Sequence, residues 1–309
     1  MRIIFMGTPD FAVASLEALL AAGENVVAVV TAPDRPAGRG QKISQSAVKE
    51  CALRHEIPVL QPEKLKDPEF IEALRTFRAD LQVVVAFRML PEVVWNMPPM
   101  GTVNLHASLL PQYRGAAPIN HAIMNGAQKS GVTTFLLQHE IDTGHILLAK
   151  EVGIDPEDTA GDLHDKLMHV GAALLVQTVQ AMKAGTITPK PQDLSRIGTL
   201  HEAPKIFKED AEIDWEQSIE RIHNHIRGLS PYPAAYTYLK GKLFKIFRSK
   251  KIAAAEGNVL PQPGSPESDG KTYLRFAASD GYIEAIEIQA EGKKKMPIAD
   301  FLRGYSWSD

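Results

Sequence analysis

The stretch RIIFMGTPDFAVASLEALLAA, residues 2–22, decides the fold because it joins a buried-strand pattern to a helical one. Its first part, Ile3–Met6, is a short unbroken apolar run, which is typical of a strand buried on both faces of a parallel sheet. Its second part, Phe11–Ala22, has apolar residues at helical spacing, and Thr8 as a cap and Pro9 in the first turn suit its start. The stretch predicts one strand–helix unit of an α/β domain.

The same alternation continues along the first half of the chain and indicates a doubly wound α/β domain with a mostly parallel sheet. The further expected strands are Val26–Thr31, Leu81–Ala86 and Gly101–Leu105, and the further helices are Ser46–His55 and Pro68–Arg78. Two later strands flank a turn and predict an antiparallel extension of the sheet, which a long amphipathic helix follows. These are Thr133–Gln138, His145–Val152 and the helix Ala160–Met182.

Composition changes at Thr186–Pro204, which has prolines and no periodicity and therefore predicts an inter-domain linker. Beyond it, a helix over Asp214–Gly228 precedes short strands separated by turns such as Pro261–Gly270, a spacing typical of a small β-barrel. The expected strands are Ala235–Leu239, Lys242–Ser249, Thr272–Ala277 and Gly281–Ala290.

The composition is that of a globular protein, since 44% of the 309 residues are hydrophobic and 23% are charged. Cys51 is the single cysteine, which excludes an intramolecular disulfide and fits a reducing compartment. The sequence opens without a signal-peptide pattern, and its apolar runs are far shorter than the ~20 residues of a bilayer span. We therefore expect a cytoplasmic protein with no membrane association.

The net charge of -3 gives no bulk attraction for nucleic acid, so such binding would need local basic patches.

Two common nucleotide-binding patterns are missing from the sequence. The first strand–helix turn, Gly7–Ala12, has one glycine where the dinucleotide-binding fingerprint needs three, and Pro9 lies in its middle. The backbone there cannot approach a pyrophosphate closely, and the sequence has no P-loop. These absences argue against NAD, FAD and P-loop nucleotides as ligands.

The segment TVNLHASLLPQYRGAAPIN, residues 102–120, carries the side chains best suited to chemistry. Asn104 and His106 share one side of a predicted strand, because side chains alternate with period two, and they lie where that strand ends. Ligands bind at the carboxyl ends of strands in open α/β sheets. An amide can donate to a developing oxyanion and an imidazole can move a proton near neutral pH, so the pair suits acyl transfer. Either residue alone also fits an ordinary structural role.

A carboxylate that could orient His106 occurs in the turn Glu140–Gly144, between the two later strands. This residue is Asp142, and the alternative for it is an Asx-turn role. Asp10, Asp34 and Asp80 have the same side chain, but none lies in so compact a turn between apolar strands.

Two other kinds of site have less support. Ser108 lies outside a Gly-x-Ser-x-Gly elbow, which argues against a serine hydrolase. The pairs His164/His169 and His223/His225 lack the cysteine or glutamate partners of a zinc site, so we expect no metal.

The set Asn104-x-His106, followed by Ser108–Pro111 and further on by Asp142, resembles the active-site signature of the formyltransferases that use 10-formyltetrahydrofolate. Longer segments resemble those members of the family whose acceptor is methionyl initiator tRNA, and the likeness covers nearly the whole chain. These segments are His106–Ile119, Ile3–Ala12 and Pro33–Gly40.

The resemblance implies a formyltransferase catalytic domain over residues 1–189, a linker over 190–206 and a C-terminal OB-like β-barrel domain over 207–309 that binds tRNA. It implies transfer of the formyl group to the α-amine of methionine on the initiator tRNA, in support of translation initiation. Asn104, His106 and Asp142 would be its catalytic residues. Two alternatives stay open, namely a formyltransferase that acts on a ribonucleotide or amino sugar and a non-catalytic RNA- or folate-binding protein. No obligate protein partner is evident.

The resemblance further implies which residues line the folate site. These are Ser108, Leu109, Leu110 and Pro111, together with Phe87, Arg88 and Met89 at the edge of the pteridine pocket. At residues 86–91 the chain reads AFRMLP where the family usually has Tyr-Gly-Leu-Ile-Leu-Pro. The departure introduces a bulky charged side chain, Arg88, which either faces solvent or contacts the folate glutamate.

Two basic segments fit contacts with tRNA. The loop Asp34–Lys42 contains glycines and arginines and fits insertion along an acceptor stem, although a solvated loop has the same composition. Residues 240–251 carry six positive and no negative charges interleaved with apolar residues, which predicts a phosphate-facing strand or an edge strand protected from aggregation. Lys293–Lys295 adds a third patch. The residues expected to contact tRNA are Arg35, Arg39 and Lys42 in the first segment and Lys242, Lys245 and Arg248 in the second.

Overall fold

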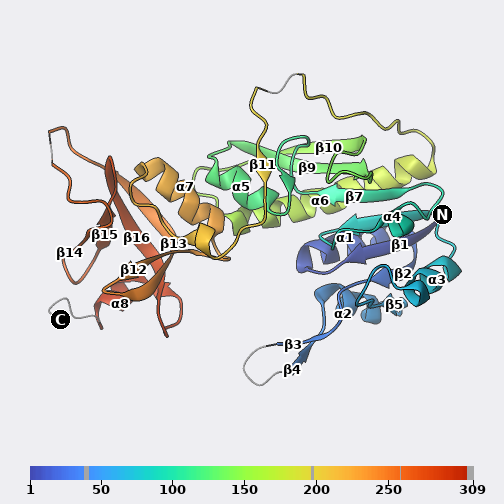
Figure 1. Cartoon of the computed structure of the whole chain (residues 1–309), viewed down its shortest axis with the longest axis horizontal. Helices are drawn as coiled ribbons and strands as arrows, with labels where there is room; N and C mark the ends of the chain where they lie inside the picture. Colours follow the sequence, from blue (N-terminus) through green and yellow to red (C-terminus); the bar gives the residue numbers. More distant parts are fainter. Residues whose placement is uncertain (38–41, 196–197, 258, 305–309) are drawn as a thin grey trace. The chain divides into compact units, whose positions relative to one another are not determined.

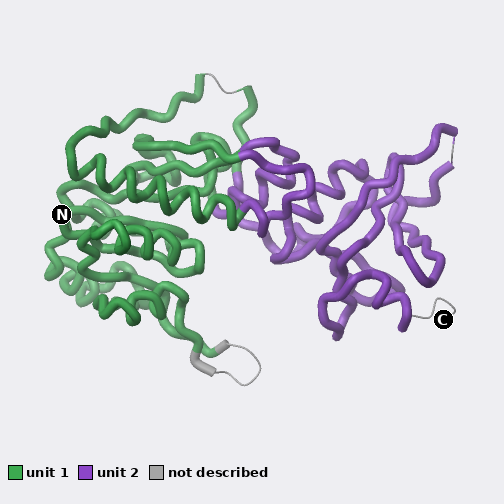
Figure 2. The backbone as a smooth tube through the Cα atoms, turned by 180° about the vertical axis from the view of Figure 1, so that it is seen from behind, with its two compact units in different colours: residues 1–115, 130–152, 164–202 green, residues 116–129, 153–163, 203–309 purple. Residues whose placement is uncertain are grey.

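The computed structural model describes residues 1–37, 42–195, 198–257 and 259–304. The chain forms two compact units, which Figure 2 shows in different colours. Unit 1 comprises residues 1–115, 130–152 and 164–202, and unit 2 comprises residues 116–129, 153–163 and 203–309. None of the helices in the described ranges combines the length and the apolarity that a bilayer crossing requires.

Unit 1 is built on a seven-stranded sheet with the order β10-β9-β7-β6-β1-β2-β5 (Figure 1). Strands β7, β6, β1, β2 and β5 pair in parallel, and β9 runs antiparallel to β7. The strands are β1 (Arg2–Gly7), β2 (Asn25–Val30), β5 (Val59–Leu60), β6 (Leu81–Val85), β7 (Thr102–His106), β9 (Lys129–Leu136) and β10 (Ile146–Gly153). The predicted mostly parallel sheet is confirmed.

Helices cover both faces of this sheet. Ile4 and Met6 of β1 share one buried cluster with Phe70 of α3 and with α4 residues, whereas Gly171 of α6 lies against Leu105 on the opposite face. The sheet is therefore doubly wound, as its continuous apolar strands require. The helices of this unit are α1 (Asp10–Ala21), α2 (Ala47–Arg54), α3 (Pro68–Thr76), α4 (Glu92–Trp95) and most of α6 (Ala160–Lys183).

The start of α1 differs from the prediction. Pro9, not Thr8, occupies the N-cap position, and no side chain caps the helix. The expected Thr8 cap is wrong because the helix begins at Asp10, whose carboxylate in the first turn complements the helix dipole instead. In contrast, Ser46 caps α2 and accepts from the backbone N–H of Lys49 at 3.1 Å.

The order of the strands brings the carboxyl ends of β1, β6 and β7 to one edge of the sheet. From β1 the chain moves to β2 and β5 on one side and later to β6 and β7 on the other. Gly7 pairs with Val85, which in turn pairs with Leu105, so these three ends are aligned. Such a reversal of strand order leaves the crevice in which α/β proteins bind ligands. The last residues of β7 lie at this edge.

Four short strands of the described chain lie outside the two main sheets. The ends of the predicted basic loop form a small antiparallel hairpin. Its strands are β3 (Arg35–Ala37) and β4 (Lys42–Ser44), and two-residue strands β8 (Arg114–Gly115) and β11 (Glu202–Ala203) occur further along the chain.

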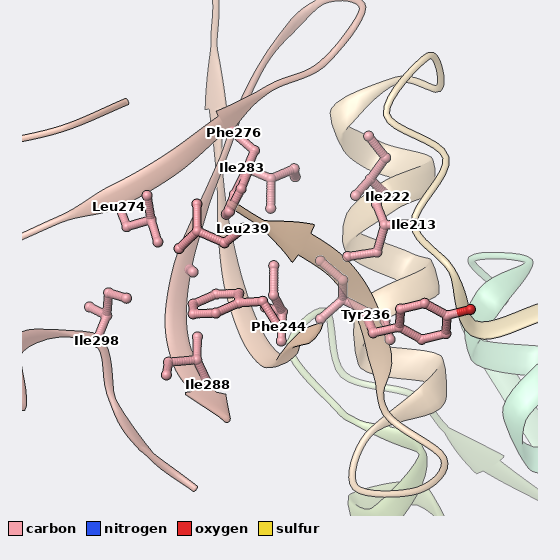
Figure 3. Close-up of a cluster of buried hydrophobic side chains, with 14 of the residues drawn as sticks. Ile213, Ile222, Tyr236, Leu239, Phe244, Leu274, Phe276, Ile283, Ile288 and Ile298 are labelled. Atoms are coloured by element: carbon pink, nitrogen blue, oxygen red, sulfur yellow. The ribbon is translucent and has the colours of Figure 1, made fainter. Parts of the chain in front are cut away.

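Unit 2 contains an antiparallel sheet with the order β12-β13-β16-β15-β14, and β17 also pairs with β16. It forms a half-barrel, which agrees with the barrel-like C-terminal domain predicted from strand spacing. The strands are β12 (Ala235–Leu239), β13 (Lys242–Ala253), β14 (Pro266–Ser268), β15 (Leu274–Ala277), β16 (Gly281–Ala290) and β17 (Met296–Pro297). Figure 3 shows the core, in which Phe244 and Ile283 of the sheet and Ile222 of α7 belong to one buried cluster.

Residues 116–129 and 153–163 precede the expected linker but pack within unit 2. The Asn120 amide donates to the Gly228 carbonyl at 2.7 Å, and the Arg227 guanidinium donates to the Asp158 carbonyl at 2.9 Å. Helix α5, which lies in the first of these stretches, packs closely against α7. The helices of this unit are α5 (Pro118–Met124), the 3-10 turn Glu209–Ala211, α7 (Ile219–Leu229) and α8 (Ile298–Leu302).

Candidate active site

Asn104 and His106 lie on one face of β7, at the sheet edge where β1, β6 and β7 end. Asn104 pairs with Val84 of β6 and Phe135 of β9, so its backbone is fixed from both sides. Its side chain is half-buried, and within the described ranges the amide has no hydrogen-bond partner. A fixed strand thus presents an amide whose donors are free for a ligand.

The imidazole of His106 is almost fully buried, and both of its nitrogens face polar groups. Nε2 lies 2.8 Å from the Tyr113 carbonyl oxygen. Because a carbonyl only accepts, Nε2 carries a proton and donates it. The other ring nitrogen, Nδ1, lies 3.7 Å from Oδ2 of Asp142. The predicted carboxylate is therefore beside the predicted histidine.

The turn that carries Asp142 is held by contacts from distant parts of the chain. Asp142 has a φ of 54°, in the left-handed region, and its Oδ2 accepts from the Gly115 N–H at 2.9 Å. The Gln192 amide donates to the carbonyls of Asp142 and Gly144 at 2.7 and 3.0 Å. At Gly144 a Cβ would lie 1.7 Å from the Leu136 carbonyl oxygen, so only glycine fits there. Gln192 was not among the predicted site residues, because it lies in the expected linker.

The segment after β7 is pinned by a second residue that the prediction missed. The Thr133 hydroxyl, on β9 directly opposite His106, donates to the Ser108 carbonyl at 2.7 Å and accepts from the Leu110 N–H at 3.1 Å. Leu110 and Pro111 are buried, whereas Leu109 is partly exposed. These bonds fix the backbone of residues 108–111 against the sheet.

Ser108 has a structural role in this segment. Its side chain is fully buried, and Oγ donates to the Gln112 carbonyl at 2.6 Å. The hydroxyl therefore points into the protein rather than toward a ligand, and any contribution of Ser108 to a folate site comes through the shape of its backbone.

The segment after β6 places Phe87, Arg88 and Met89 near the same sheet edge. Met89 is 77% exposed and Phe87 is half-buried. Arg88 donates to the carbonyls of Pro62 and Glu63 at 2.7 and 3.0 Å, and its buried Nε has no hydrogen-bond partner among the described residues. Burial, together with the nearby charge of a second arginine, lowers the pKa of the Arg88 guanidinium. This side chain is thus bound to protein carbonyls rather than extended into solvent.

The residues predicted to contact tRNA lie in several places. Arg35 is exposed on β3, the backbone of Lys42 pairs with Ala37 on β4, and Arg39 lies outside the described residues. At the base of this hairpin Asp34 binds Lys49 and Gln61, and the hydrogen bond from Lys49 lowers the pKa of the Asp34 carboxyl.

The three predicted residues on β13 are also separated from one another. Lys242 is exposed, Lys245 donates to the Pro233 carbonyl at 3.2 Å, and Arg248 lies 3.6 Å from Asp162. Register shifts on both sides of Arg248 interrupt the alternation that the prediction assumed. No single stripe therefore joins these three side chains.

The histidine pairs considered as metal ligands have other partners. His164 packs against Phe11 and contacts Asp165, and His223 contacts Ser249 at 3.0 Å. Within the described ranges, one group of side chains has metal-ligand spacing, and it joins α1 to α2. Its members are Glu17 of α1, Cys51 of α2 and His55, which follows α2.

The arrangement at the end of β7 can support acyl transfer. It combines a free amide donor, a buried imidazole with one nitrogen available and a carboxylate beside that nitrogen. The amide suits a developing oxyanion, and the imidazole–carboxylate pair suits proton transfer.

Comparisons with known proteins agree with this chemistry. A family model described as formyl transferase matches residues 1–179, and one described as formyl transferase, C-terminal domain, matches residues 205–306. The methionyl-tRNA formyltransferase of Bacteroides fragilis is 53% identical over 311 residues, covering 99% of this chain and 95% of that protein. The methionyl-tRNA formyltransferase of Flavobacterium johnsoniae is 48% identical over 314 residues, covering 100% of this chain and 98% of that protein.

The fold also matches solved structures. WlaRD, a sugar 3N-formyl transferase crystallised in the presence of dTDP and 5-N-formyl-THF, superposes with a TM-score of 0.67. The match covers 95% of this chain and 99% of that one at 22% identity, so it bears on the fold alone. On the family models and the full-length identities, the chain belongs to the formyl transferase family and, within it, to the methionyl-tRNA formyltransferases.

Proposed function

We propose that this protein transfers a formyl group from 10-formyltetrahydrofolate to the α-amine of methionine on initiator tRNA, and so supports translation initiation. The observation that carries the proposal is the Asn104 amide, which has no hydrogen-bond partner in the described part of the chain and shares a strand face with His106, the neighbour of Asp142. The full-length identity with methionyl-tRNA formyltransferases supports methionyl-tRNA as the acceptor.

The reaction forms a bond between the amine nitrogen and the formyl carbon and breaks the bond from that carbon to N10 of the folate. Attack by the neutral amine puts negative charge on the formyl oxygen, and the Asn104 amide donates to that oxygen. The amine nitrogen loses one proton and N10 gains one, so the reaction needs a group that accepts and then returns a proton.

His106 is suited to this proton transfer through Nδ1. Its Nε2 is occupied by the Tyr113 carbonyl, which also fixes the plane of the ring. Nδ1 takes the proton from the attacking amine and delivers it to N10 as the folate leaves. Between these events the imidazolium is stabilised by the Asp142 carboxylate, 3.7 Å away.

For the folate we propose a site formed by Ser108–Pro111 together with Phe87, Arg88 and Met89. Support comes from the position of both segments after the neighbouring parallel strands β6 and β7. Thr133 gives the first segment a fixed backbone, and the partly exposed Phe87 and Met89 give the second an apolar surface suited to a flat ring. No metal takes part in the proposed chemistry, because the amide and the imidazole supply both functions.

For the tRNA we propose contacts from Arg35, Arg39 and Lys42 in the first basic segment and from Lys242, Lys245 and Arg248 in the second. We assign formyl transfer to residues 1–189, a linking role to 190–206 and tRNA binding to 207–309. We propose the cytoplasm as the compartment of this activity, because the proposed substrates are a charged tRNA and a reduced folate.

The experiment that tests the proposal offers the purified protein 10-formyltetrahydrofolate with methionyl initiator tRNA, methionyl elongator tRNA or an amino-sugar nucleotide. Formylmethionine should form on initiator tRNA, and the free amino sugar should remain unmodified. Formylation of the small amine alone would establish a small-molecule enzyme. Salt-dependent RNA binding without any transfer between pH 6 and 9 would establish a non-catalytic protein.

A further inference from the structure

An open pocket in unit 2 combines exposed aromatic rings with lysines. It has a volume of about 520 Å³, within the range of small-molecule sites. We call it the Phe207 pocket and define it by Phe207, Tyr232, Lys205, Lys208 and Lys245, which line it together with small apolar residues.

Two of the most exposed aromatic side chains of the described chain lie at this pocket. Phe207 is 57% exposed and Tyr232 is 83% exposed, although a folded protein gains by burying such rings. Neither ring stacks on another ring in the described ranges. Tyr236 also lines the pocket, and Figure 3 shows its ring at the margin of the core with the hydroxyl pointing away from the apolar cluster. The lining of the pocket thus combines aromatic rings with apolar side chains.

The charge at the pocket is positive. Lys205, Lys208 and Lys245 line it, and none of the described lining residues is acidic. Lys205 lies 5.3 Å from the centre of the Phe207 ring, and Lys245 donates to the Pro233 carbonyl. None of the three lysines has a carboxylate within ion-pair distance in the described part of the chain. Two carboxylates lie next to the lining residues, since Asp210 accepts from the Phe207 N–H at 2.7 Å and Glu212 accepts from the Tyr236 hydroxyl at 3.4 Å. An anion that enters the pocket therefore meets lysines that form no ion pair with these carboxylates.

Asn120 adds one polar contact at the pocket. Its Nδ2 is committed to the Gly228 carbonyl, which fixes the amide and leaves Oδ1 as an acceptor. Ala116, another lining residue, directly follows Gly115, whose N–H binds the Asp142 carboxylate. In the sequence, a lining residue of the pocket thus directly follows the residue whose N–H holds the Asp142 carboxylate.

We propose that the Phe207 pocket binds one unpaired nucleotide of the acceptor end of the tRNA, with its base against Phe207 and Tyr232 and its phosphate on the lysines. This inference rests on the proposed function, because it takes tRNA as the ligand. Base stacking on aromatic side chains combined with a positively charged groove is how proteins hold single-stranded nucleic acid without reading its sequence. Such a contact holds the unpaired end, whereas contacts with the duplex stem alone would not need aromatic rings.

The test uses the full-length protein and a single-stranded RNA tetranucleotide that contains one 2-aminopurine. The wild type should quench the fluorescence of this base by stacking. The double variant Phe207→Ala/Tyr232→Ala should lose the quenching and bind roughly ten-fold or more weakly, as loss of base stacking does. Phe207→Trp should retain both. The control Tyr238→Ala, which removes an exposed tyrosine that does not line the pocket, should behave as the wild type.

A second measurement examines the lysines and separates the inference from the proposed function. Lys208→Gln should reduce the slope of log binding constant against log salt by roughly 0.7, as loss of one phosphate contact on a single strand does. Lys250→Gln, an exposed lysine outside the pocket, should leave it unchanged. Unchanged quenching in the aromatic double variant, with wild-type formylation of methionyl-tRNA intact, overturns the inference but not the function. A wild type that does not formylate methionyl-tRNA overturns the function instead.

Discussion

Oδ2 of Asp142 lies 3.7 Å from Nδ1 of His106, too far for a hydrogen bond and close enough for a strong charge interaction. The same oxygen accepts from the Gly115 N–H, so the carboxylate is held in place independently of the imidazole. The pair therefore stabilises the ring most when the ring is positively charged. In the proposed mechanism that state exists only between proton uptake and proton delivery, which makes the interaction catalytic rather than structural.

Replacing Asp142 by Asn removes this charge and keeps the shape of the side chain. We expect turnover to fall by roughly 10² or more, the scale of losing support for a general acid–base group. The double variant Asp142→Asn/His106→Asn should be no slower than the slower single variant, because residues that act as one unit are not additive. Initial rates of methionyl-tRNA formylation measure this. Fully additive losses would show that the two residues act separately.

Replacing Asn104 by Ala removes the free amide donor. Turnover should fall by roughly 10²–10³, as it does when one oxyanion donor is lost, because the donor acts on charge that develops only during reaction. The KM for both substrates should change little. Steady-state kinetics with a thermal-unfolding control measure the effect, and a rise in KM at unchanged kcat would assign Asn104 to substrate binding instead.

Replacing Ser108 by Ala should leave turnover within a few-fold of the wild type, because the hydroxyl is buried and bonds to the Gln112 carbonyl. The free energy of unfolding should fall by about 1 kcal/mol through loss of that hydrogen bond. Urea denaturation and the formylation assay measure the two effects. Loss of activity in a variant of wild-type stability would give the serine a chemical role.

Replacing Arg88 by Leu leaves the carbonyls of Pro62 and Glu63 without their donor. We expect the free energy of unfolding to fall by about 1–3 kcal/mol and the KM for 10-formyltetrahydrofolate to rise, because the segment after β6 loses its anchor. Arg88→Lys should be intermediate, since an ammonium group lacks the planar fork that reaches two carbonyls. Unchanged stability and KM in the Leu variant would mean that the segment is held without Arg88.

Stability of unit 2 should depend on pH through His223 and His225. Burial lowers the pKa of both imidazoles below the ordinary value, and for His223 the nearby Glu157 offsets part of the effect. The unfolded chain therefore takes up protons that the folded chain does not. The stability is complete above a pH of about 6.5 and declines as the pH falls from there toward the lower folded values.

Thermal unfolding between pH 8 and 5.5 measures this decline. The double variant His223→Gln/His225→Gln should show a smaller decline than the wild type over the same range, whatever its stability at pH 8. Equal declines in the two proteins would place the titrating groups elsewhere in the chain.

Much of the sheet and the central residues of the candidate site followed from local patterns in the sequence. The apolar runs of β1, β2, β6 and β7 are long enough to fix their type, and period two places Asn104 and His106 together. Asp142 was distinguished by its compact turn, and in the structure it has a φ of 54° and lies beside His106. These features depend on neighbours within a few residues.

The parts that could not be predicted depend on contacts between distant residues. Nothing near Thr133 or Gln192 in the sequence shows that one pins the segment after β7 and the other holds the Asp142 turn. Strand β14 is three residues long, too short for a periodic pattern, and lies inside an expected turn. Helix α5 packs closely against α7 at Gly228, where a Cβ would lie 2.5 Å from Met124, and local propensity does not encode this contact.

The central claim is that one imidazole, held by Tyr113 and charged beside Asp142, moves the proton during formyl transfer. Its most direct test is the single-turnover rate with saturating 10-formyltetrahydrofolate and methionyl initiator tRNA for the wild type and His106→Ala. The account predicts a rate at least roughly 10² lower in the variant, with unchanged tRNA binding. A rate within a few-fold of the wild type in a folded variant would contradict it.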